Sequence, residues 1–250
     1  MEINMTTKRL KLFVKRHAEI SCYINGSFWR DTYKRIKQFI DHNDIVLDVG
    51  SFHAPYTKYL PNTVVGIDLP SNGRFGFSKD LLEEIRVKTS FIPIIASAEA
   101  LPFRSNFFDK IVCTEVLEHI PNDKSAVSEM ARVLRNEGKI FLTTPNGGAI
   151  PLKYGIREHL RHYSENDLRN LLNDFLNKVI ILNRFRFFNF LNLQYGLKDS
   201  WNKNRLNIPL FLTSLFVSWV YDVISYLLEK FSKGSYLNLV AICSKQCETS

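Results

Sequence analysis

Two aspartates that stand twenty positions apart each accompany an apolar run. Asp48 lies in the run 45–49 directly before Gly50, and Asp68 closes the run 64–67. In nucleotide-binding α/β folds, a carboxylate at the end of the second strand accepts hydrogen bonds from both ribose hydroxyls. The two aspartates therefore predict a nucleoside site.

The residues after Gly50 argue against a dinucleotide. Phe52 and Pro55 stand where the dinucleotide fingerprint requires further glycines, which let backbone amides approach a pyrophosphate. A nucleoside with a cationic tail and no phosphate needs fewer glycines and more carboxylates. S-adenosylmethionine fits this description, and we expect Asp48 to face its positive end.

Glu115, Glu118 and His119 form a second group, because one turn of helix brings them to the same side. Carboxylate oxygens together with an imidazole suit magnesium or manganese. Without a metal, His119 is a candidate general base, since the unperturbed pKa of histidine lies near neutrality. We predict no metal. Bound magnesium is the weaker alternative, and a structural role for His119 at a strand-to-helix turn stays open.

His159 and His162 lie in the charged segment 157–163, just before a capping box that starts at Ser164. Charges and imidazoles beside an active-site mouth favour binding of an anionic substrate or activation of a hydroxyl. An exposed, solvated loop is the alternative.

Apolar runs that alternate with amphipathic helices must position these residues. Such alternation buries both faces of a mostly parallel sheet, and ligands bind beyond the carboxyl ends of its strands. We predict a doubly wound, Rossmann-like α/β fold with seven strands and a helical insertion before the last strand. The expected strands are 45–49, 64–67, 91–96, 110–114, 139–143, 179–190 and 236–243. The expected helices are one over 29–40, one with Ala126, Met130, Val133 and Leu134 on one face that stops at Gly138, and one after Ser164.

Composition narrows the class of protein. The 250 residues are 45% hydrophobic and carry a formal net charge of +8, which indicates a folded chain and favours anionic partners. The basic cluster at 8–16 predicts a solvated face or a membrane-surface helix. The four cysteines form no CxxC pair and no secretory signal is apparent, so we expect a cytoplasmic location.

The segment 208–228 is apolar enough to raise the question of a membrane span, but Asp222 interrupts it. Its polar residues share one stripe, so an amphipathic helix is favoured. A substrate lid, an oligomer contact, a peripheral membrane contact and packing on its own sheet stay open.

Several segments resemble class I S-adenosylmethionine-dependent methyltransferases of the type-11 group, whose members act on small molecules, lipids, quinones and sugars. The segments are VLDVGSFHAPYTKYLPNTVVGIDL, ASAEALPFRSNFFDKIVCTEVLEHIP and EMARVLRNEGKIFLTTPN, which together span 45–146 in family order. The later HLRHYSENDLRNLL is similar to the helix that follows in many members.

The resemblance implies a site residue by residue, with turn chemistry or capping as the alternative for each. The residues implied for cofactor binding are Asp48, Gly50, Ser51, Asp68, Leu69, Ser97, Ala98, Glu99 and Thr114. The residues expected to act in the chemistry are Glu115, His119 and His159. Two positions depart from the family pattern, since Phe52 replaces a glycine and Ser97 replaces an acid.

We expect an N-terminal helical segment over 1–43 and a methyltransferase domain over 44–250. Within that domain, the cofactor-binding core is placed at 44–146, the acceptor side with the insertion at 147–235, and the closing strand at 236–243. The expected reaction is methyl transfer from S-adenosylmethionine to oxygen of a small-molecule, lipid, quinone or sugar acceptor. A methyltransferase-like binding module without catalysis, motivated by Phe52 and Ser97, and an RNA methyltransferase are the alternatives.

Overall fold

The computed structural model describes residues 27–52, 54, 56–58, 60–70, 76–77, 82, 90–148, 152, 158–185 and 236–245. The chain divides into two compact units, one of residues 1–35 with 186–234 and the other of residues 36–185 with 235–250. The basic cluster at 8–16, the segment 208–228 and two of the cysteines lie outside the described residues, so the expectations for them stay predictions, as do the expected domain limits.

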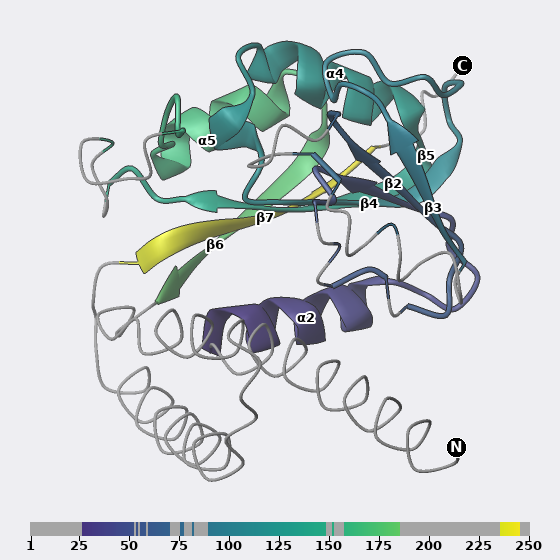
Figure 1. The fold of residues 1–250 in the computed structure, drawn as a ribbon. Coiled ribbons are helices and arrows are strands. Elements are labelled where there is room, and N and C mark those ends of the chain that lie inside the picture. Colours follow the sequence, from purple (N-terminus) through teal and green to yellow (C-terminus); the bar gives the residue numbers. More distant parts are fainter. Residues whose placement is uncertain are drawn as a thin grey trace, which may run out of the picture. The chain divides into compact units, whose positions relative to one another are not determined.

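Seven strands form one sheet in the order β3-β2-β1-β4-β5-β7-β6 (Figure 1). The strands are β1 (Val46–Val49), β2 (Val64–Asp68), β3 (Phe91–Ile95), β4 (Phe108–Thr114), β5 (Leu134–Pro145), β6 (Asn177–Phe185) and β7 (Tyr236–Ser244). The first five are parallel, while β7 runs antiparallel to both β5 and β6. The predicted mostly parallel α/β fold with seven strands is confirmed.

The strand order reverses between β1 and β4, which are hydrogen-bonded neighbours with Val49 opposite Cys113. In open α/β sheets such a reversal leaves a crevice at the carboxyl ends of the two strands, because their connections leave on opposite faces. The residues after Val49 and after Thr114 are therefore the ones that the fold places at a ligand site.

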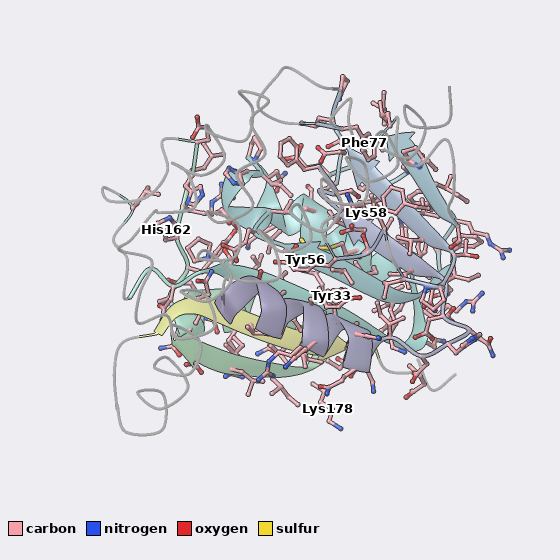
Figure 2. The ribbon with its side chains drawn as sticks, turned by 60° about the horizontal axis from the view of Figure 1, so that its bottom comes forward. Tyr33, Tyr56, Lys58, Phe77, His162 and Lys178 are labelled. Carbon is pink, nitrogen blue, oxygen red and sulfur yellow. The ribbon has the colours of Figure 1, made fainter. Side chains whose placement is uncertain are left out.

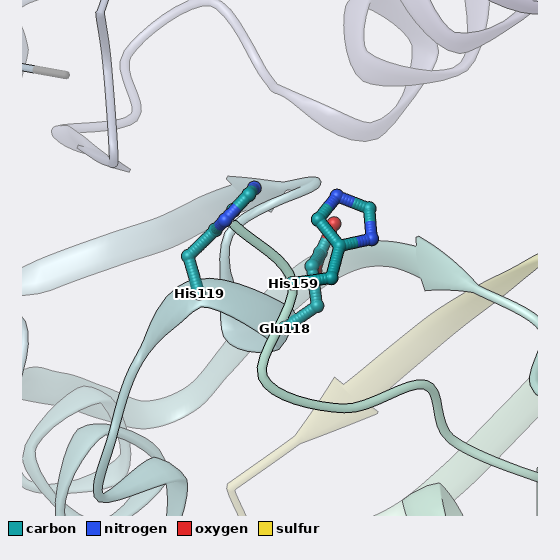
Figure 3. A group of neighbouring side chains, drawn as sticks. All are labelled: Glu118, His119 and His159. Carbon is teal, nitrogen blue, oxygen red and sulfur yellow. The ribbon is translucent and has the colours of Figure 1, made fainter. Parts of the chain in front are cut away.

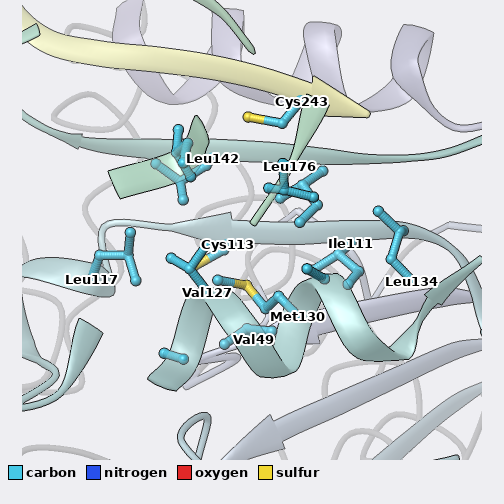
Figure 4. Packing of buried hydrophobic residues seen from close by; sticks show 14 of the residues in the cluster. Val49, Ile111, Cys113, Leu117, Val127, Met130, Leu134, Leu142, Leu176 and Cys243 are labelled. Carbon is cyan, nitrogen blue, oxygen red and sulfur yellow. The ribbon is translucent and has the colours of Figure 1, made fainter. Parts of the chain in front are cut away.

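Helices α4 (Asp123–Val133) and α5 (Glu165–Asn173) lie together over one face of the sheet (Figure 1). Val127 and Met130 of α4 belong to the same buried cluster as Ile111 and Cys113 of β4 (Figure 4). On helix α2 (Ser27–Phe39), the ring of Phe39 lies 5.7 Å from that of Phe141 in β5. The predicted Ser164 cap of α5 is confirmed, since its hydroxyl accepts a hydrogen bond from the amide of Asp167.

The predicted extent of the second helix is wrong at its carboxyl end. Helix α4 stops at Val133, and Leu134 already has extended backbone and pairs with Phe108 of β4. Gly138 therefore lies inside β5 instead of ending a helix. Sheet pairing overrides the helical pattern here, because Leu134 pairs with β4 and is fully buried as a strand residue.

No helix among the described residues is long and apolar enough to cross a membrane.

Met130→Ala tests the packing of α4 on the sheet. We expect the free energy of unfolding to fall by about 2–5 kcal/mol, since the side chain is completely buried and its removal leaves a cavity. Urea denaturation followed by circular dichroism measures the change. Ser128→Ala on the same helix is the control, and an equal loss in both variants would contradict the packing.

Candidate functional site

Asp48 is buried at the carboxyl end of β1, where the loop residue Thr57 donates a hydrogen bond from its hydroxyl to the carboxylate. Ser51 donates its hydroxyl to the backbone carbonyl of Asp48 at 2.8 Å. Burial raises the pKa of Asp48 to about 7, and the negative charge of Asp68 acts in the same direction. Asp48 is therefore a carboxylate whose charge a nearby cation would stabilise.

Gly50 holds the loop after β1 against the turn after β4. Its φ is +70°, and a Cβ atom there would lie 2.4 Å from Cγ2 of Val116. The amides of Gly50 and Ser51 both donate to the carbonyl of Ile67 in β2 at 3.0 Å. Only glycine fits this position, both for its backbone conformation and for the close approach of Val116.

Phe52 and Asp68 are in direct contact through the backbone. The amide of Phe52 donates to Oδ2 of Asp68 at 2.7 Å, and the amide of Leu69 donates to Oδ1 at the same distance. Phe52 has a φ of +41°, and the residue is 39% exposed. Burial raises the pKa of Asp68, while these amides partly offset that effect. The backbone amide of Gly76 also donates to this carboxylate and lowers the pKa.

Ser97 and Glu99, which the resemblance implies for cofactor binding, form local hydrogen bonds in this structure. Oγ of Ser97 accepts a hydrogen bond from the amide of Glu99 at 3.2 Å. Oε1 of Glu99 accepts one from the amide of Asn122, the residue that caps α4. Both contacts match the turn-and-cap alternative, and the predicted roles of Ser97, Ala98 and Glu99 in cofactor binding stay predictions.

Glu115 stands at the end of β4, after Thr114, with a φ of +55° that is uncommon for a residue with a side chain. Thr143 of β5 donates its hydroxyl to Oε1 at 2.8 Å. Nδ2 of Asn238 in β7 lies 2.9 Å from Oε1 and 3.0 Å from Oε2. Asn238 was missed at the sequence level because it is 123 positions away and nothing in its neighbourhood marks it.

Glu118 is completely buried three residues further on. Thr144 donates to its Oε2 at 3.0 Å, and Oε1 has no hydrogen-bond partner among the described residues. Burial, followed by the charge of Glu115, raises the pKa of Glu118 well above its usual range. A buried carboxyl oxygen without a partner is costly, so Oε1 is a position where a ligand could be bound.

Three imidazoles gather beside Glu118. The rings of His119 and His159 lie 4.6 Å apart, and Nδ1 of His159 lies 2.7 Å from Nε2 of His162 (Figure 3 shows the first two with Glu118, and Figure 2 labels His162). Burial lowers the pKa of His119 and lowers that of His159 to about 4, where the charges of the other two imidazoles also contribute. Both rings are therefore neutral at pH 7 and able to accept a proton.

The segment before α5 is docked on the turn after β4 by main-chain contacts. The amide of Leu160 donates to the carbonyl of Glu118 at 2.8 Å, and Arg161 donates to the carbonyls of Ile120 and Pro121. This docking brings His159 to His119. The alternative of a fully solvated loop does not describe these residues.

Glu118, His119 and His159 form the group of potential metal ligands in the described part of the chain, with their ligand atoms within 4.8 Å of one another. This set differs from the predicted one, because Glu115 is turned toward Thr143 and Asn238. One carboxylate and two imidazoles could hold a divalent ion. The prediction that the protein uses none stays a prediction.

Comparison with known proteins shows which family part of this chain resembles. Residues 47–142, which run from β1 through most of β5, match the family model described as a methyltransferase domain. Residues 47–142 are therefore similar to class I methyltransferase domains of the type-11 group. This confirms the resemblance that the ordered segments suggested.

Among the relatives of this methyltransferase domain is a ubiquinone biosynthesis O-methyltransferase of Dechloromonas aromatica. It is 38% identical over 106 residues, which cover 40% of this chain and 44% of that protein. The chain spans about half the length of the curated relatives it matches.

Two solved structures share the fold of the methyltransferase domain. Phosphoethanolamine N-methyltransferase 2 of Haemonchus contortus, in complex with S-adenosyl-L-methionine, superposes with a TM-score of 0.63 at 15% identity, covering 91% of this chain and 57% of the other. The 4+2 cyclase SpnF superposes with a TM-score of 0.59 at 18% identity, covering 87% and 82%. At such identities the likeness concerns the fold alone.

Gly50→Ala tests the contact with Val116. We expect a loss of about 1–3 kcal/mol in the free energy of unfolding, because the added Cβ meets Val116 and the positive φ is strained. Gly148→Ala is the matched control, since a Cβ there meets, within the described part of the chain, only Oδ1 of Asn146 at 3.2 Å. Chemical denaturation of both variants measures the difference, and equal stabilities would show that the loop is not held by this contact.

Proposed function

We propose that the protein transfers a methyl group from S-adenosylmethionine to an oxygen of a small-molecule acceptor. The observation that carries the proposal is the placement of Asp48, Gly50 and Asp68 at the carboxyl ends of β1 and β2, beside the reversal of strand order. The family match and the methyltransferases among the relatives support it.

In this proposal each carboxylate has a separate task toward the cofactor. Asp68 accepts hydrogen bonds from the ribose hydroxyls, and the buried Asp48 faces the cationic end of the ligand. Gly50 lets the loop pass close to both the ligand and Val116. The amide of Phe52 donates to Asp68, so the residue that replaces glycine still contacts this carboxylate through its backbone.

The chemistry needs little from the protein beyond positioning. The acceptor oxygen attacks the methyl carbon, the bond from carbon to sulfur breaks, and its electron pair stays on sulfur, which becomes a neutral thioether. The proton of the acceptor hydroxyl passes to His119 or His159, both of which are neutral at pH 7. We assign Glu115 an electrostatic role, since its two oxygens already receive hydrogen bonds from Thr143 and Asn238.

An acceptor hydroxyl on a quinone, lipid or sugar fits this arrangement, and the similarity to ubiquinone biosynthesis O-methyltransferases favours a quinone.

Two other functions are each supported by a specific observation. SpnF has this fold and is a cyclase, so a binding module or another chemistry is the second candidate. The net charge of +8 is the reason to keep RNA as a third acceptor class, and a salt-sensitive gel shift would reveal it.

Calorimetric titration with S-adenosylmethionine and its demethylated product tests the cofactor part of the proposal. We expect both ligands to bind, and we expect Asp68→Ala to weaken binding by about 10- to 100-fold through loss of the ribose contacts. Asp174→Ala is the control. Asp174 is an exposed residue at the end of α5, where it forms an ion pair with Lys124. No heat from the unaltered protein at millimolar ligand would overturn the proposal.

The affinity for S-adenosylmethionine is expected to depend on pH through Asp48. Because its pKa is raised to about 7, the residue is protonated below pH 7 and charged above it. A cationic ligand binds the charged form of Asp48 more tightly, so the affinity should rise as the pH increases from 6 to 8. Titrations at pH 6, 7 and 8 measure the change. Asp48→Asn should bind weakly with a flat profile over this range, and a profile in the variant like that of the unaltered protein would contradict the assignment.

A further inference from the structure

The turn after β4 is tied to strands on both sides of it. Val116 packs on the backbone of Gly50 in the loop after β1. The preceding residue, Glu115, is held by Thr143 of β5 and by Asn238 of β7. The Glu115 carboxylate is therefore fixed from one side while its neighbour contacts the candidate cofactor loop.

Asn238 is well placed to fix the direction of that carboxylate. It is 3% exposed, and its amide nitrogen lies within 3.0 Å of both oxygens of Glu115. An amide nitrogen and a hydroxyl supply hydrogens to these oxygens, and such donors stabilise negative charge. Glu115 also holds a φ of +55°, a strained conformation that persists only where the surroundings enforce it.

Carboxyl groups are concentrated at this end of the sheet. Asp48, Glu115 and Glu118 all act on the buried thiol of Cys113, whose pKa burial and these three charges raise well above its usual range. Among the ion pairs of the described residues, none includes Asp48 or Glu118. A fixed carboxylate in such surroundings favours a ligand with a positive charge, because Coulomb interactions are stronger away from bulk water.

We propose that Asn238 is a positioning residue that holds the Glu115 carboxylate as a fixed negative charge, through which the site prefers a sulfonium cofactor to its neutral demethylated product. The inference rests on the proposed function and deepens it. Methyl transfer removes the positive charge from sulfur, so the attraction by Glu115 ends at the moment when the product must leave. The same group then contributes to binding before the reaction and to release after it.

The test compares the affinities of two ligands that differ in charge. Calorimetry with S-adenosylmethionine and S-adenosylhomocysteine is carried out on the unaltered protein, Glu115→Gln and Asn238→Leu. Glu115→Gln keeps the shape of the side chain and removes its charge, and the amide of Asn238 can turn to present its oxygen. We expect this variant to bind S-adenosylmethionine about tenfold more weakly while its affinity for S-adenosylhomocysteine changes less than about twofold.

Asn238→Leu should shift the ratio of the two affinities in the same direction by a smaller factor, since the charge remains and its direction is lost. Asn177→Leu, the same chemical change on the exposed start of β6, should leave the ratio as in the unaltered protein. Thermal melts establish that each variant is folded, and Glu115→Gln alone decides the test should Asn238→Leu fail to fold.

The outcomes separate this inference from the proposed function. Equal weakening of both ligands, or an unchanged ratio in Glu115→Gln, would show that the contacts of Glu115 serve structure only and would overturn the inference. Failure of S-adenosylmethionine to bind the unaltered protein would overturn the proposed function, and the inference with it.

Discussion

The contact of Val116 with the backbone of Gly50 is the constraint on which the candidate site depends. It joins the loop after β1, which carries the predicted cofactor residues, to the turn after β4, which carries Glu115, Glu118 and His119. The two strands are neighbours at the point where the strand order reverses, so their ends must meet, but the distance between their loops depends on the absence of a side chain at Gly50. The residues predicted to bind the cofactor and those predicted to act in the chemistry are thereby held at one fixed separation.

Much of this arrangement was predictable because it is local in the sequence. The apolar runs gave the strands to within a few residues, and Asp48 and Asp68 lie at the strand ends where the pattern placed them. The cap at Ser164 was recognisable for the same reason, since its partner is only three residues away. Such features depend on short stretches of chain, whose sequence patterns do not depend on contacts with distant segments.

The remainder depends on pairings between distant segments. The pattern around Leu134 favours helix, and only the presence of Phe108 in the neighbouring strand makes it extended. The spacing in the sequence groups Glu115 with Glu118 and His119. In the structure, its carboxylate instead accepts hydrogen bonds from Thr143 and Asn238. His159 reaches His119 because main-chain hydrogen bonds dock its segment on the turn after β4, and no side-chain motif announces those bonds.

The position of β7 between β5 and β6 affects how the domain is made on the ribosome. Strand β6 joins the sheet only through β7, although it precedes β7 by some fifty residues in the chain. A growing chain can assemble the five parallel strands early, but β6 has no partner until residues 236–244 have emerged. Asn238 arrives with the same strand. Synthesis of β7 therefore supplies both the pairing partner of β6 and the hydrogen bonds from Asn238 to Glu115. A nascent chain cannot fix the Glu115 carboxylate in this way before the sheet is complete.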